Sequence, residues 1–140
     1  MNAPLYTPEI LRLAASLQEP RPLDREDGRA ELRSPTCGSR VTMAVQLDGD
    51  RRVEQISLQV HACAFGQASA ALIEQHAIGR EHQEIAEALL LLSRWLAQEQ
   101  DELCDWPGFA TLAPARPRKA RHGAILLPFR ALLAAIESAK

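Results

Sequence analysis

Residues 41–62 read VTMAVQLDGDRRVEQISLQVHA, and their pattern is the strongest indication of the fold. Apolar and polar side chains alternate on both sides of Asp48-Gly49-Asp50, three residues that favour a tight turn. A period of two is typical of strands that bury one face and leave the other in water. The stretch therefore predicts two antiparallel strands. Val53 is out of phase with Ile56, so we expect a bulge or a strand start just after Val53.

The flanking segments complete the pattern. Residues 28–33 alternate in the same way and predict a further short strand, which ends at Ser34-Pro35. Helical spacing marks a segment opening at Thr7-Pro8, a segment between Cys63 and Gly79, residues 81–98, and a last helix carrying Ile125 to Ile136. Strands followed by helices predict an α+β fold, a three-stranded antiparallel sheet with helices packed on one face. We expect residues 114–119 to form an exposed connector, and Pro128 to lie in the first turn of the last helix or to kink it.

Length and composition restrict the function classes. The 140 residues fit a single domain, 1–140, and 16 basic against 18 acidic residues give a net charge of −2. This nearly balanced charge gives no overall electrostatic attraction to nucleic acid. No apolar run is long enough to cross a membrane. The N-terminal residues lack the pattern of a signal peptide. We therefore expect a cytoplasmic protein without nucleic-acid or membrane partners.

Two of the cysteines offer chemistry. The chain has three cysteines, an odd number, and the expected compartment is reducing, which argues against a disulfide framework. Cys37 lies in the corner between the first two strands, and Cys63 lies where the third strand gives way to a helix. The start of a helix stabilises a thiolate, the form that binds metal and attacks sulfur. The pair predicts either a thiolate site at one edge of the sheet or, alternatively, two packed small hydrophobic residues.

The sequences around these two cysteines are distinctive. Residues 34–40 read SPTCGSR, and residues 63–70 read CAFGQASA. Together they closely resemble the NifU N-terminal/IscU family, whose members are scaffolds for iron–sulfur cluster assembly. The order of the predicted elements agrees, and the resemblance extends from Tyr6 to Ser138. The additional helical segment around residues 80–100 and the Gln67-Ala68-Ser69 sequence resemble the SufU-like branch of the family.

The resemblance implies a definite site. Three cysteines and one aspartate would hold zinc or iron with tetrahedral geometry and receive sulfur from a cysteine desulfurase. Cys37 and Cys63 match the first two cysteines of the family. Two positions depart from the family pattern: Ser39 stands where the aspartate belongs, and Ala124, or at best Gly123, stands where the third cysteine belongs.

Other residues are weaker candidates for metal ligands. His122 lies beside the missing cysteine and is the candidate third ligand, because imidazole and thiolate together suit zinc; a helix cap or a surface position is the alternative. His61 falls on the exposed side of its strand, which favours a surface position or one just outside a metal site. Cys104 lies in the additional helical region, where it is either a packed or incidental residue or a stray ligand.

We therefore expect an iron–sulfur scaffold or sulfur-acceptor protein that works with a cysteine desulfurase. It is expected to act at most as a sulfur carrier, not as an enzyme. Cys37 and Cys63 are the expected ligands of zinc or of an iron–sulfur cluster, and Cys37 is the candidate persulfide acceptor.

Alternative hypotheses remain open. The chain could be a degenerate family member that acts as a binding or regulatory module without a metal site, because two strong ligands are fewer than a stable site needs. In another hypothesis, a homodimer pools Cys37 and Cys63 of two chains around one cluster. A basic cluster beside the site is either a docking surface for an acidic partner such as the desulfurase or a solubilising loop. Its members are Arg116, Arg118, Lys119 and Arg121.

Overall fold

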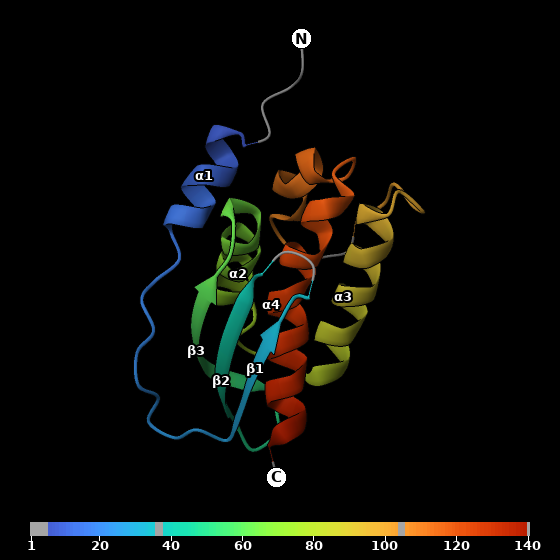
Figure 1. The fold of residues 1–140 in the computed structure, drawn as a ribbon. Helices are drawn as coiled ribbons and strands as arrows, with labels where there is room; N and C mark the ends of the chain where they lie inside the picture. Colours follow the sequence, from blue (N-terminus) through green and yellow to red (C-terminus); the bar gives the residue numbers. More distant parts are fainter. Residues whose placement is uncertain (1–5, 36–37, 104–105, 140) are drawn as a thin grey trace.

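A three-stranded sheet lies against a layer of helices (Figure 1). The computed structural model describes residues 6–35, 38–103 and 106–139. In chain order, the elements are α1 (Pro8–Ala15), β1 (Gly28–Arg33), β2 (Arg40–Leu47), β3 (Val53–His61), α2 (Ala64–His76), α3 (His82–Leu96), a 3₁₀ helix η1 (Phe109–Ala115) and α4 (Lys119–Ser138). Within these ranges, none of the helices combines the length and the apolar character that a membrane span requires.

The sheet follows the predicted meander. Its order is β1-β2-β3, and both pairs of neighbouring strands are antiparallel. The register of β2 against β3 shifts between Gln46, which faces Gln55, and Leu47, which faces Val53. One extra residue of β3 therefore forms a bulge, as the break in alternation predicts, and the strand begins at Val53 itself.

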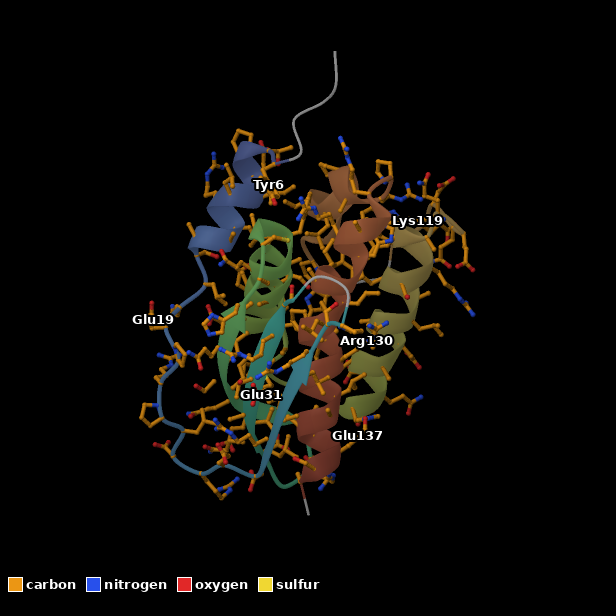
Figure 2. All side chains as sticks on the ribbon, viewed as in Figure 1. Tyr6, Glu19, Glu31, Lys119, Arg130 and Glu137 are labelled. Atoms are coloured by element: carbon orange, nitrogen blue, oxygen red, sulfur yellow. The ribbon has the colours of Figure 1, made fainter. Side chains whose placement is uncertain are left out.

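The helices cover one face of the sheet. α4 lies against β1 and β2, α2 lies against β3, α1 packs on α2, and α3 packs on α4 (Figure 1). Val41, Met43 and Val45 of β2 are fully buried in this core. Glu31 of β1 is exposed on the sheet (Figure 2). The arrangement confirms the predicted α+β fold with helices on one face.

A glycine allows α4 to approach the start of β1. A Cβ atom on Gly28 would overlap the carbonyl oxygen of Ala135. Next to it, the N–H of Arg29 donates a hydrogen bond to Oγ of Ser138 (2.9 Å). The last turn of α4 is thereby fixed against the first residues of the sheet.

The chain before α4 differs from the sequence prediction. Pro114 and Ala115 belong to η1, and α4 begins at Lys119, so the exposed connector is shorter than predicted: within residues 114–119, Pro117 and Arg118 connect the two helices and are exposed. Ala115 is fully buried, and Arg116 is partly buried. The difference arises because an apolar contact with the core fixes this segment, although its proline and arginine content favours an open loop.

Pro128 lies in the middle of α4, not in its first turn. A proline there has no N–H for the carbonyl of Ala124, one turn earlier. The hydroxyl of Ser69 in α2 donates to the next carbonyl, that of Ile125, at 2.6 Å, and Ser69 is fully buried. A side chain of α2 therefore supports α4 where its own hydrogen-bond ladder is interrupted.

Candidate functional site

A groove opens where β3 passes into α2. Its volume is about 440 Å³. Its walls come from the residues just before β2, from the junction of β3 and α2, and from the first turns of α4. In Figure 1 the end of β3 and the start of α4 both lie in the upper half of the molecule. The lining residues are Gly38, Ser39, Val60, His61, Ala62, Cys63, Gln67, Ala120, Arg121 and Ala124.

Cys63 occupies the N-cap position of α2 in the wall of this groove. Its backbone is extended (φ −67°, ψ 174°), and its carbonyl accepts a hydrogen bond from the N–H of Gln67 (3.0 Å) at the start of the helix. The thiol is free and partly buried, and it caps none of the unpaired N–H groups of the helix. Its sulfur atom therefore borders a groove through which a ligand or another sulfur atom can reach it.

The corner between β1 and β2 borders the same groove. Cys37 lies outside the described residues. Gly38, the next residue, lines the groove with a φ of +72°, a backbone conformation that favours glycine. The N–H of Ser34 donates to the carbonyl of Ser39 (2.9 Å) across the corner, and Ser39 is buried while lining the groove. The residues that follow Cys37 are thus held at the groove that contains Cys63.

α4 contributes small side chains to the groove. Ala124 is buried and lines it, whereas Gly123 is not among the lining residues. The phase of the helix therefore turns position 124 toward the groove. α2 and α4 are close here, because a Cβ atom on Gly66 would lie 3.2 Å from the carbonyl oxygen and 3.5 Å from Cβ of Ala124. A methyl group and the Ser39 hydroxyl occupy the positions where the family resemblance implies a thiolate and a carboxylate.

His122 lies at the junction of η1 and α4. Its Nε2 is 2.8 Å from the carbonyl oxygen of Ala115 and 3.1 Å from that of Arg116. Both partners can only accept, so Nε2 carries a proton and donates it. In the neutral ring this leaves the lone pair on Nδ1 as the possible metal-binding atom. His122 does not line the groove, so the structure does not bring it together with Cys63 there.

His61 does line the groove. It is the last residue of β3 and is exposed, two positions before Cys63 in the sequence. Alternation along the strand predicts its exposure but not its place in the groove, because the groove also needs the first turns of α4, which lie far away in the sequence. The His-Ala-Cys spacing is the sequence signal that could have indicated this pair.

The described residues contain no group of three or more His, Cys, Asp or Glu side chains that could hold a metal ion. Both Cys37 and Cys104 lie outside that set. Cys63 and His61 are therefore the ligand-type side chains that the described part of the groove supplies.

The basic cluster is smaller than the sequence suggests. Arg116 donates from Nε to the carbonyl of Trp95 (2.9 Å) and from Nη2 to the carbonyl of Gln100 (3.0 Å), and its guanidinium lies over the Trp95 ring. Arg116 therefore ties η1 to the end of α3 and is not part of a free surface. The remaining members, Arg118, Lys119 and Arg121, form a basic rim: Arg118 and Lys119 are exposed, and Arg121 lines the groove. Figure 2 labels Lys119 at the start of α4.

Solved structures share this fold. A NifU-like protein (N-terminal) from Brucella abortus superposes with a TM-score of 0.87 and 29% sequence identity, over 96% of this chain and 93% of that chain. A candidate iron–sulfur cluster assembly scaffold protein of the SUF system from Fervidobacterium islandicum superposes with a TM-score of 0.81 and 22% identity, over 94% of this chain and 96% of that chain. At 22% identity the second likeness concerns the fold alone.

Comparison with sequence families gives the same assignment. No curated protein matches the sequence. The family model described as the NifU-like N terminal domain matches residues 5–107, which is most of the chain and includes the β1–β2 corner, the end of β3 and α2. The chain therefore belongs to the family of NifU-like N-terminal domains.

Proposed function

We propose that this chain is an iron–sulfur cluster assembly scaffold or sulfur acceptor, with Cys63 and Cys37 as its thiolates. One observation carries the proposal: the free thiol of Cys63 borders a groove whose other walls are the corner after Cys37 and the first turns of α4. Membership of the family of NifU-like N-terminal domains supports this role.

Sulfur transfer to such a groove needs no oxidant. A thiolate of the scaffold attacks the outer sulfur atom of a persulfide on the donor. A new S–S bond forms as the donor's S–S bond breaks, and the donor cysteine leaves as a thiolate. We propose Cys37 as the acceptor, because it stands between Pro35 and Gly38 in the sequence and the next residue, Gly38, lines the groove. The expected donor is a cysteine desulfurase, and reducing conditions in the cytoplasm would keep the thiols free.

The cargo would be held less tightly than by a full set of thiolates. Ser39 and Ala124 offer a hydroxyl and a methyl group where the family resemblance implies stronger ligands. His122 stays a predicted third ligand, and it would bind through Nδ1 because Nε2 donates to the Ala115 carbonyl. A homodimer that pools cysteines is a second way to complete the coordination of a cluster.

The basic rim would favour an acidic partner. Arg118 and Lys119 are exposed at the start of α4, and Arg121 reaches the groove beside them. Positive charge of this kind speeds the encounter with a partner of opposite charge. Docking of a desulfurase would therefore be expected to bring the donor sulfur to the groove.

The same substitutions favour a second candidate function. Two of the four implied ligand positions hold Ser39 and Ala124, and stable zinc sites normally use at least three protein ligands. A chain that has lost its cargo could still use the groove and the basic rim as a binding or regulatory module.

Metal and sulfur loading decide between the two functions. Protein purified without oxygen is analysed for zinc, iron and acid-labile sulfide, and is then incubated with a desulfurase and cysteine and analysed by mass spectrometry. We expect metal or cluster in the wild type, less in Cys37→Ala and Cys63→Ala, and a sulfur adduct on Cys37. Reduced metal content in His122→Ala would support the third ligand. Background metal together with no labelled cysteine would exclude the scaffold function and leave the binding module.

A further inference from the structure

We infer that His61 is a ligand for the metal of the cargo and binds it together with Cys63. The inference rests on the proposed function only for the nature of the cargo, a thiophilic metal ion such as zinc or iron. It concerns which side chain of this chain supplies a nitrogen ligand.

Position is the first argument. His61 and Cys63 both line the groove, from the two ends of a single three-residue segment. Because the backbone at Cys63 is still extended (φ −67°, ψ 174°), the helical turn that would carry the chain away begins only after it. Two ligands that close in sequence need little loss of chain entropy to meet at one ion.

Availability is the second argument. The side chains of His61 and Cys63 make no hydrogen bond or ion pair with any residue that the structure describes. The exposed imidazole of His61 can therefore bind a ligand in the groove without giving up a hydrogen bond to a described residue. His122 differs on both counts, since it lies outside the groove lining and its Nε2 is bonded to the Ala115 carbonyl.

The neighbouring charges are the third argument. Arg40 is the neighbour of His61 on β2. The Nε of Arg40 lies 3.7 Å from a carboxylate oxygen of Glu31 on β1, so its positive charge is partly neutralised there. Arg121 also lines the groove from α4, and its positive charge opposes a bound cation, so binding must come from the two ligands themselves. A neutral imidazole together with a thiolate suits zinc or iron, and the nitrogen ligand replaces the thiolate that Ala124 does not supply.

Cobalt is the probe for this site, because Co²⁺ takes the tetrahedral geometry of zinc and reports its ligands by absorption. Wild type, His61→Ala, His61→Gln, His122→Ala and Cys63→Ala are titrated with Co²⁺ under anaerobic, reducing conditions. His82→Ala is the control, since His82 pairs with Glu137 on α4 and does not line the groove.

We expect both His61 variants to bind Co²⁺ at least about tenfold more weakly, because even the loss of a partner that only orients a ligand costs about that much. The thiolate charge-transfer band per bound ion should stay constant while the ligand-field bands shift, because a nitrogen ligand is lost and no sulfur is. Cys63→Ala should lower the charge-transfer band. His82→Ala should match the wild type, and so should His122→Ala, because this inference gives the nitrogen ligand to His61 in place of His122. Zn²⁺ should also shift the imidazole ¹⁵N signals of His61 in the wild type, a measurement that needs no variant.

The outcomes separate this inference from the proposed function. If wild type binds Co²⁺ and both His61 variants bind it equally well with unchanged spectra, the inference is wrong while the scaffold function stands. If only His122→Ala weakens binding, the nitrogen ligand is His122 and the inference is likewise overturned. If wild type binds no Co²⁺ yet accepts persulfide sulfur, the inference fails and the sulfur-acceptor function is retained.

Discussion

The two ends of the sheet use their polar groups in opposite ways. At the closed end, where β1 begins and β2 finishes, Asp27 Oδ2 accepts from the N–H of Leu47 (2.7 Å) and Asp27 Oδ1 accepts from Nε of Arg25 (2.9 Å). Nη2 of Arg25 donates in turn to the Leu47 carbonyl (2.7 Å). At the open end, which is the groove, the side chains of Cys63 and His61 bond to no described residue.

The difference separates stability from chemistry. A donor or acceptor that the protein has already satisfied is not available to a ligand, so a binding end must leave some groups unused. β2 has eight residues, and at about 3.3 Å per residue the two ends lie roughly 23 Å apart. Sites that far apart are energetically almost independent. Substitutions at the closed end should therefore alter the free energy of unfolding, and substitutions at the open end should alter the affinity for a metal ion.

The largest effect is expected at the closed end, from Gly28→Val. The first side-chain atom would overlap the Ala135 carbonyl oxygen, so α4 must move away from β1 or the strand must distort. We expect a loss of about 3 kcal/mol in the free energy of unfolding, measured by urea denaturation. Gly49→Val is the matched control, because no atom lies within 4 Å of a Cβ there. Equal losses in the two variants would show that α4 does not close this end.

The two ends of the sheet also differ in how much of their structure can be predicted from the sequence. Alternation fixes the strands and even the bulge beside Val53, because one buried face determines the register. The junction that carries Cys63 follows from the same pattern. These features depend on residues that are close in the sequence, and the alternation of apolar and polar side chains reports on such local structure.

Which residues line the groove depends on contacts between parts of the chain that are distant in the sequence. The sequence pattern alone does not determine these contacts. Whether position 123 or 124 faces the groove depends on the phase of α4, which packing against Gly66 sets. From the sequence, Arg116 is expected to be a free surface charge. In the structure it donates a hydrogen bond to the carbonyl of Trp95, a residue far from it in the sequence. The groove that His61 and Cys63 share likewise needs the first turns of α4 as its other wall, and these are distant in the sequence.

A second prediction tests the open end, through Ala124→Cys. A thiol at position 124 would enter the groove beside Cys63, so affinity for Co²⁺ should rise by about tenfold or more, with a stronger thiolate charge-transfer band. Gly123→Cys is the control for an added thiol that does not line the groove, and it should leave both quantities near wild type. The phase of α4 would be misassigned if Gly123→Cys gave the larger gain. Urea unfolding of Ala124→Cys should stay close to wild type, since the closed end is untouched.

The smallest effect is expected from Asp27→Asn at the closed end, and it depends on pH. The hydrogen bond from Arg25, and next the one from the N–H of Leu47, hold the pKa of Asp27 below its ordinary value. Such a carboxylate stabilises the folded state at pH values above its unfolded pKa, about 3.9, and loses this contribution as the pH falls through its lower folded pKa. Urea unfolding should therefore find wild type more stable than Asp27→Asn at pH 7, and the gap should shrink below about pH 4.

The size of that gap must be small, because Arg25 and Asp27 meet where solvent screens them. Asp24→Asn is the control, since Asp24 is an exposed carboxylate on the same connecting segment. A gap between wild type and Asp27→Asn that stays constant from pH 7 to pH 3 would mean that Asp27 acts through its shape and not through its charge. Co²⁺ affinity should be the same in both variants, because the closed end contributes no ligand. A change in Co²⁺ affinity in Asp27→Asn would show that the two ends of the sheet are energetically coupled.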